Sequence, residues 1–244
     1  MGYFVVIDLE MCRVPKSNLK QYNYKNEIIE IGAAMLDECY KPVDKFKAYV
    51  HPVYGVISNF IRDLTGIKPE DVEDASLVTE AADSLFDWIR TNIKKDIASK
   101  SGDKADEAGL EEKTKRAVED IKFVSWSTAD KSQIIHEYET KQLPLDMFEP
   151  YFESWIDCQP MFSEKLKTKR KYRLEEALIA SDIITEGSAH DGLVDAYNTA
   201  LLYAKMNTET EFKLNKYYKV ACEENSRSLQ FSLADMIDSL GIED

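Results

Sequence analysis

Tyr3-Phe-Val-Val-Ile-Asp-Leu-Glu10 joins an apolar run to two carboxylates, Asp8 and Glu10. The run predicts a buried strand, and because side chains alternate across a strand, the two carboxylates project from the same face. Two like charges held that close repel each other unless a cation lies between them or one takes up a proton. A divalent cation such as Mg²⁺ or Mn²⁺ fits oxygen ligands of this kind. The simpler alternative is that both residues begin a solvated loop.

The composition of the whole chain is that of a globular protein. Its 244 residues are 44% hydrophobic and 31% charged, enough for one large domain, or one domain with an appendage. The four cysteines are scattered, no apolar run approaches the ~20 residues of a membrane span, and no signal peptide is visible, so we expect a cytoplasmic, reduced protein without a membrane partner. The net charge of −14 argues against tight binding of long duplexes. A cleft for a single-stranded end remains compatible with it, because bound cations supply local positive charge.

Strand patterns dominate the first fifty residues, and helical patterns follow. Residues 27–36 and 45–50 predict two further strands, which with the first would form an antiparallel meander. A short helix is expected over 58–64, and a long amphipathic helix over 74–97. Residues 98–119 are highly charged and nearly free of large apolar side chains. They predict an exposed, solvated insertion that is helical in part.

The second half predicts strands that alternate with helices. Strands are expected over 121–126 and 153–157, and helices over 128–140, 160–167, 173–180 and 194–206, with further apolar-periodic pieces over 212–222 and 229–240. The order predicts an α/β fold, a mixed sheet of three antiparallel strands followed by parallel strands and flanked by helices. We expect one domain over 1–206 and a helical extension over 207–244 packed on it.

Three more residues extend the acidic pattern. Asp130 follows a predicted central strand and lies in the first turn of the next helix, where the helix dipole alone would favour a carboxylate. In open α/β sheets, ligands bind outside the carboxyl ends of the strands, which is the edge that Asp8 and Glu10 occupy. His190 and Asp195 are five residues apart, about 140° around a helix, and therefore do not share a helical face. We expect His190 on a loop and Asp195 in the first turns of the following helix; on their own, a capping histidine and a surface aspartate would be the simpler interpretation.

The five residues together resemble the DEDDh branch of the 3′–5′ exonucleases, relatives of polymerase proofreading subunits, whose fold is RNase-H-like. The first motif is Asp8-x-Glu10, the second is Asp130, and the third is His190-x₄-Asp195. Five further segments look like the branch that trims histone-mRNA ends and small interfering RNAs, including its bacterial sporulation-inhibitor homologues: Glu27-Ile-Ile-Glu-Ile-Gly32, Tyr49-Val-His-Pro52, Leu64-Thr-Gly-Ile67, Phe123-Val-Ser-Trp126 and Asn198-Thr-Ala-Leu201. The resemblance covers residues 3 to about 205. That branch often has Arg after the histidine, where this chain has Asp191.

The resemblance implies a metal-dependent exonuclease that releases nucleoside 5′-monophosphates from single-stranded 3′ ends of RNA or DNA. Two divalent metal ions, Mg²⁺ or Mn²⁺, about 3.5–4 Å apart would activate water and stabilise the leaving oxygen. By analogy with the family, Asp8 would bridge both ions, Glu10 and Asp195 would bind the ion that activates water, and Asp130 would serve the other. His190 would be the general base, for which the ordinary pKa of histidine, near 6.5, is suited.

Substrate contacts are predicted from apolar and basic residues. By analogy with the family, Met11 would separate the terminal bases and Phe60 would provide a stacking face; the alternative is that both are partly buried core residues. The run Lys165-Leu-Lys-Thr-Lys-Arg-Lys171 could guide a phosphate backbone, although such runs are more often solvated loops. Two other functions stay open, the same chemistry on very short oligonucleotides and a regulatory protein-interaction module with little nuclease activity.

Overall fold

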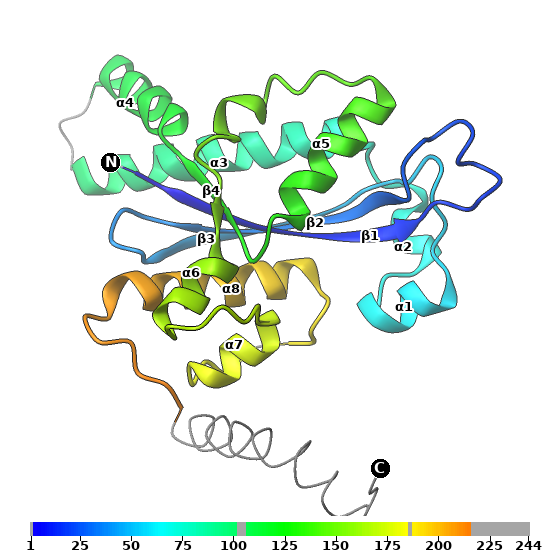
Figure 1. Ribbon diagram of the computed structural model, residues 1–244. Helices are drawn as coiled ribbons and strands as arrows, with labels where there is room; N and C mark the ends of the chain where they lie inside the picture. Colours follow the sequence, from blue (N-terminus) through cyan, green and yellow to red (C-terminus); the bar gives the residue numbers. More distant parts are fainter. Residues whose placement is uncertain (1, 102–105, 185–186, 216–244) are drawn as a thin grey trace, which may run out of the picture.

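The structure, a computed structural model, describes residues 2–101, 106–184 and 187–215 (Figure 1). Its centre is a five-stranded sheet in the order β3-β2-β1-β4-β5. The strands are β1 (Phe4–Arg13), β2 (Asn26–Leu36), β3 (Pro42–Tyr49), β4 (Lys122–Ser125) and β5 (Ile156–Asp157). The first three pair antiparallel, and β4 and β5 continue the sheet in parallel. The predicted α/β mixed sheet is therefore confirmed.

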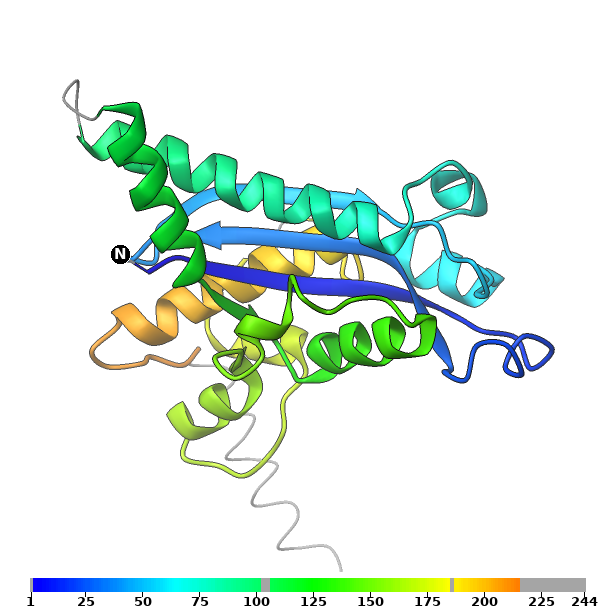
Figure 2. The ribbon, with the colours of Figure 1, turned by 90° about the horizontal axis from the view of Figure 1, so that it is seen from above.

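Helices cover both faces of this sheet (Figures 1 and 2). One layer consists of α3 (Val78–Ser101), α4 (Glu107–Glu119) and α5 (Ala129–Lys141), and the other of α6 (Cys158–Lys165), α7 (Leu174–Ala180) and α8 (Gly192–Thr208). Two short helices, α1 (Asn59–Thr65) and α2 (Pro69–Glu73), follow β3. No described helix has the length and apolar character needed to cross a membrane.

Alternation along β1 divides its side chains between two cores. Val5 and Ile7 pack in the cluster that contains α3, whereas Val6 packs with residues of α6, α7 and α8. Asp8 has the same parity as Val6, so its side chain emerges on the face that α8 covers. A register shift between Glu10 and Met11 then allows β1 to continue to Arg13, beyond the predicted end at Glu10.

The segment expected as an exposed insertion over 98–119 is helical in its described part and mostly exposed, but one side of it is packed on the domain. The helix α3 continues to Ser101, and α4 packs against it with Leu110, Thr114 and Ala117 buried. These residues are spaced four and three apart, so they form one narrow stripe along the helix. An ion pair between Lys94 and Glu107 also joins the two helices, at 2.6 Å. The sequence interpretation did not recognise that Leu110, Thr114 and Ala117 form a buried stripe.

Other boundaries also differ from the predictions. The long helix begins at Val78 instead of Asp74, because the separate helix α2 occupies Pro69–Glu73; Leu77, just before the helix, is 45% exposed. The strand expected over 153–157 is reduced to Ile156–Asp157.

The start of the C-terminal extension lies against the domain. Phe212 packs edge-on to Phe162 with 6.0 Å between ring centroids, and the Asn215 N–H donates to the Ala180 carbonyl. Residues 212–215 are not helical, contrary to the helix expected over 212–222. The rest of that helix, and the one expected over 229–240, lie outside the described residues.

Candidate active site

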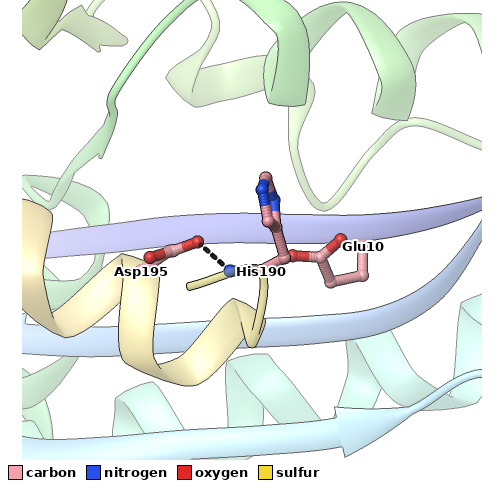
Figure 3. A group of neighbouring side chains, drawn as sticks. All are labelled: Glu10, His190 and Asp195. Atoms are coloured by element: carbon pink, nitrogen blue, oxygen red, sulfur yellow. Dashed lines mark hydrogen bonds between the residues drawn. The ribbon is translucent and has the colours of Figure 1, made fainter. Parts of the chain in front are cut away.

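Three separate elements carry the four predicted carboxylates. Asp8 and Glu10 lie on β1, Asp130 in the first turn of α5, and Asp195 in the first turn of α8. Asp130, Glu10 and Asp195 are the three negative charges that act most strongly on Asp8, so the structure brings together the four acidic residues that the sequence analysis selected. His190 joins them from the loop before α8, and the potential ligand atoms of Glu10, His190 and Asp195 all lie within 4.8 Å of one another (Figure 3).

The end of β4 creates the position of Asp130. Pairing between β1 and β4 stops at Val6 and Val124, so the backbone of β1 has no strand partner on that side from there onward. The Leu9 N–H instead donates to Oδ1 of Asp130, at 3.1 Å. This carboxylate thus replaces a strand hydrogen bond and is fixed beside Asp8 by the backbone, which a simple helix-capping role would not require.

Two glycines allow Asp195 to approach β1. Gly32 is the cross-strand partner of Asp8, and α8 begins at Gly192 directly over it. A Cβ atom added to Gly32 would lie 2.0 Å from the backbone carbonyl carbon of Gly192. Since neither backbone could accommodate such a contact, the absence of a side chain at Gly32 determines how closely the first turn of α8, with Asp195, reaches the carboxylates of β1.

We expect Gly32→Ala to destabilise the protein by about 1–3 kcal/mol or more, the usual cost of adding atoms to a packed interior. The methyl group would push α8 away from β2 and separate Asp195 from Asp8. Thermal unfolding with and without Mn²⁺ measures both effects, which should appear as a lower Tm and a smaller stabilisation by the metal. Gly2→Ala is the matched control, because a Cβ there meets only Asp120 Oδ2, at 4.0 Å. Equal Tm values for both variants would contradict the close crossing.

Sequence reasoning missed two residues beneath the start of α8. Glu30 is the cross-strand partner of Glu10 and is fully buried, and Lys47 on β3 reaches its Oε2 at 3.0 Å. The same ammonium group pairs with Asp191 at 2.8 Å. These contacts raise the pKa of Lys47 to about 12 despite the opposing effect of its burial. The sequence signal that could have revealed this network was Glu30 itself, a charged residue inside the otherwise apolar run of β2.

Asp191, which stands where the family branch often has Arg, has a structural explanation. Its Oδ1 accepts a hydrogen bond from the Val194 N–H, so Asp191 is the N-cap of α8. Partial burial would raise the pKa of this carboxyl, but the hydrogen bond from Lys47 and the backbone amides brings it below the ordinary value. Asp191 therefore helps to fix the helix that carries Asp195.

Burial raises the pKa of every carboxyl in the cluster, and repulsion from other members of the cluster raises it further at Asp8 and Glu10. Desolvation is the largest cause throughout. It raises the pKa of Asp8 well above the ordinary range, with Asp130 and Glu10 as further causes. The pKa of Glu10 rises to about 8 through burial and then Asp195, and that of Asp130 to about 7 through burial. The charged forms of these carboxyls are therefore disfavoured in the folded protein when no cation is bound.

The backbone at His190 places its imidazole beside the carboxylates. Its φ of 65° lies in the left-handed region, which histidine adopts more readily than most residues. Its N–H donates to Oδ2 of Asp195, at 2.9 Å, while the ring points away from that carboxylate (Figure 3). The side chain is exposed, so a substrate can reach the ring. The predicted arrangement, a histidine on a loop and an aspartate on the next helix, is confirmed.

The donor set fits a divalent cation. Carboxylate oxygens and one imidazole nitrogen are ligands that Mg²⁺ and Mn²⁺ accept. Burial raises the pKa of all four carboxyls, so their charged forms are poorly solvated and a bound cation would stabilise them. Lys47, the nearest cation identified above, is already paired with Glu30 and Asp191. Asp8, Glu10, Asp130 and Asp195 are therefore suited to hold metal.

The cluster predicts an unusual pH dependence for the metal-free protein. Because the pKa of Glu10 rises from 4.5 to about 8 on folding, the folded state binds more protons than the unfolded state between these values. Its contribution to stability is complete below pH 4.5 and is lost as the pH rises to 8, which costs about 3 kcal/mol at pH 7. The pKa of Asp130, about 7, acts in the same direction.

We therefore expect the Tm in chelator to fall between pH 5 and pH 8, and saturating Mn²⁺ to remove most of this fall. Differential scanning calorimetry over that range measures it. A Tm in chelator that rises with pH would show that the carboxylates are not held together as described.

The two predicted substrate contacts occupy different environments. Met11 is partly buried and packs against the core cluster that contains α3, in keeping with the alternative given for it. Phe60 on α1 is 70% exposed, and the neighbouring Val53 and Val56 are 52% and 53% exposed. The exposure of Phe60 is compatible with base stacking, but its role and that of Met11 stay predictions.

Comparisons with known proteins show that the chain is similar to several nucleases. The family profile described as Exonuclease (RNase_T) matches residues 5–101. ERI1 exoribonuclease 2 of Homo sapiens is 33% identical over 209 residues, covering 84% of this chain and 28% of the human protein. The 3′-5′ exonuclease eri1 of Schizosaccharomyces pombe is 26% identical over 227 residues, covering 89% of this chain and 72% of the yeast protein. The chain thus spans less than a third of the length of the human relative.

Solved structures show the same fold. The nuclease domain of 3′hExo, described as a DEDDh family member bound to rAMP, superposes with a TM-score of 0.63 at 20% identity, over 88% of this chain and 96% of that domain. A 3′-exonuclease solved with a histone mRNA stem-loop superposes with a TM-score of 0.59 at 18% identity, over 87% of this chain and 84% of the other. At these identities the likeness concerns the fold, an RNase-H-like sheet flanked by helices.

Proposed function

We propose that the chain is a DEDDh exonuclease near the ERI and histone-mRNA branch, a metal-dependent 3′–5′ exonuclease that acts on single-stranded RNA ends. One observation carries the proposal: four carboxylates from three elements converge beside an exposed histidine, with their pKa values raised. A protein used only for interactions has no need to keep such like charges together.

Different residues of the site have different roles in hydrolysis. Asp8, Glu10, Asp130 and Asp195 would hold the divalent ions, Mg²⁺ or Mn²⁺. When bound, such ions neutralise the charge that develops on the phosphodiester and lower the pKa of water. His190 takes the proton from the attacking water on an imidazole nitrogen.

Water then adds to phosphorus, the bond to the 3′ oxygen of the preceding nucleotide breaks, and a nucleoside 5′-monophosphate leaves. The hydrogen bond from the His190 N–H to Asp195 keeps the loop in place, so that the base and the carboxylates act on one phosphate.

The choice of RNA rests on the relatives. Those that cover most of this chain are exoribonucleases or 3′-5′ exonucleases by name, and one structural neighbour was solved with a histone mRNA stem-loop. Single-stranded DNA ends share the same phosphodiester chemistry and are the second candidate substrate. The acidic charge of the chain favours single strands over long duplexes for both.

A single-stranded RNA and a DNA of the same sequence, each labelled at the 5′ end, test the proposal. With Mg²⁺ or Mn²⁺, the wild-type protein should produce a ladder that shortens from the 3′ end and is abolished by chelator, faster on RNA than on DNA. A blocked 3′ hydroxyl on a matched strand controls for cleavage from the 5′ end. Intact strands of every length at high enzyme concentration would contradict the proposal and favour the interaction-module alternative. Cleavage of dinucleotides alone would favour the short-oligonucleotide alternative.

A further inference from the structure

One segment of this acidic protein carries concentrated positive charge. Between residues 164 and 173, a single carboxylate, Glu164, stands among six basic residues: Lys165, Lys167, Lys169, Arg170, Lys171 and Arg173. Arg170 is paired with Glu176, but among the described residues the ammonium groups of the four lysines form no ion pair. All four lysine side chains are exposed. Their charge is therefore available to a ligand.

The backbone of this segment is fixed to the catalytic side of the sheet. The Tyr172 carbonyl accepts hydrogen bonds from Trp126 Nε1 at 3.2 Å and from Gln159 Nε2 at 2.8 Å. Ser163 Oγ donates to the Arg170 carbonyl at 2.7 Å. The segment is thus attached both to the residue that follows β4 and to α6. Lysines on such an anchored backbone lose less conformational freedom on binding than lysines on a free loop.

A pocket of about 590 Å³ begins at the candidate catalytic residues and extends toward this segment. His190 and Asp195 line one part of it, and Gln159 and Arg173 line another. Asn198, also in its lining, is 2% exposed, and its Oδ1 has no hydrogen-bond partner among the described residues. A buried acceptor without a donor costs free energy, which a ligand with a donor in the pocket would recover.

A second hollow, of about 780 Å³, shares Gln159 with the first pocket. It is lined in addition by three of the exposed lysines and two carboxylates: Lys167, Lys169, Lys171, Asp157 and Glu164. One carboxylate, Asp157, accepts a hydrogen bond from the Gln159 N–H as the N-cap of α6, so it is partly compensated. Because Gln159 lines both hollows, a strand that passes along it could run from His190 to the lysines, a route called the path below.

We propose that this path, from the pocket at His190 across Gln159 to Lys167, Lys169 and Lys171, holds the part of a single-stranded substrate that lies 5′ to the cleaved bond. The inference rests on the proposed function and names how the same site holds its substrate. The departing nucleotide brings only the cleaved phosphate, whereas the upstream strand brings one phosphate for every nucleotide. The lysine-lined side therefore fits the upstream strand, and cation release on binding makes the contact depend on salt.

A lysine triple variant tests the path. In K167Q/K169Q/K171Q the side chains keep most of their length but lose three charges. The control K95Q/K113Q/K115Q loses the same three charges from exposed lysines of α3 and α4, on the opposite face of the sheet. The affinity of each triple variant for a labelled single-stranded RNA of about 12 nucleotides is measured by fluorescence anisotropy. Binding is measured in the His190→Asn background with Mg²⁺, and cleavage in the wild-type background on the same RNA and on a dinucleotide.

We expect the path variant to bind the long RNA about tenfold more weakly at about 50 mM salt, with the slope of log K against log salt reduced by about 2 relative to the control. The ratio of kcat/KM on the long strand to that on the dinucleotide should fall by a similar factor. Equal binding and equal ratios in the two variants would overturn the path, as would a wild-type protein that binds no single strand. Because binding is measured apart from cleavage, a protein that binds strands in this way but cleaves none would defeat only the proposed function.

Discussion

Asp8→Asn is expected to reduce kcat/KM on single-stranded RNA by at least about 10³-fold and, at the same time, to stabilise the metal-free protein. The loss follows from the electrostatic environment of Asp8, on which Asp130, Glu10 and Asp195 all act, so that Asp8 would be among the residues that hold a divalent ion. An amide has the same shape but no charge, so the charge supplied by the metal is lost from the reaction. The gain in stability follows from the raised pKa, because a charged Asp8 costs folding free energy at neutral pH and Asn does not.

Initial rates and thermal unfolding in chelator measure the two effects of Asp8→Asn. Asp87→Asn makes the same change in charge at an exposed position on α3 and serves as the control. If the variant kept its activity within tenfold of the wild type, Asp8 would not be essential to the reaction. A lower Tm in chelator would show that the carboxylate is stabilising, contrary to the electrostatics described above.

His190→Asn is expected to reduce kcat by about 10²- to 10⁴-fold, the usual contribution of a general base. Asparagine adopts the left-handed backbone conformation found at position 190 and keeps the N–H that donates to Asp195, so the loop should hold its place. Its amide cannot take a proton from water at neutral pH. The acid limb of the pH–rate profile, which reports deprotonation of the base, should therefore disappear in the variant.

Stabilisation by Mn²⁺ distinguishes a variant that has lost only the general base from one that has lost the metal site. It should remain substantial in His190→Asn, since all four carboxylates are present, and should be much reduced in Asp8→Asn. The control is His136→Asn, which replaces an exposed histidine of α5 that stacks on Tyr24. If His190→Asn kept the wild-type pH–rate profile, another group would have to be the base.

Local patterns in the sequence predicted the parts of the fold that depend on neighbours along the chain. The apolar run before Asp8 predicted β1, and helical periodicity predicted most of α3, α5 and α8. The five candidate site residues came from two short spacings, two residues in β1 and five residues before and within α8, and from Asp130 at the start of a helix. Their selection as a set rested on the resemblance to the DEDDh exonucleases. Each spacing lies within one short stretch of the chain, so it can be recognised in the sequence without knowledge of the tertiary structure.

Features that depend on contacts between distant elements could not be predicted in this way. The network of Glu30, Lys47 and Asp191 requires the register of β2 against β1 and β3 and the crossing of α8 over Gly32. No window of sequence contains these relations. The packing of α4 on α3 was missed for a related reason, since small residues such as Ala117 become a core stripe only when a second helix lies against them.

The release of the terminal nucleotide in a single turnover tests the central claim most directly. An RNA labelled at its last phosphodiester is mixed with excess protein and Mg²⁺ or Mn²⁺, and the first product is identified by chromatography. The structure predicts that the label appears as a nucleoside 5′-monophosphate with the wild-type protein, and that Asp8→Asn releases almost none in the same time. Release of internal fragments or of nucleoside 3′-phosphates, or equal release by the two proteins, would contradict it.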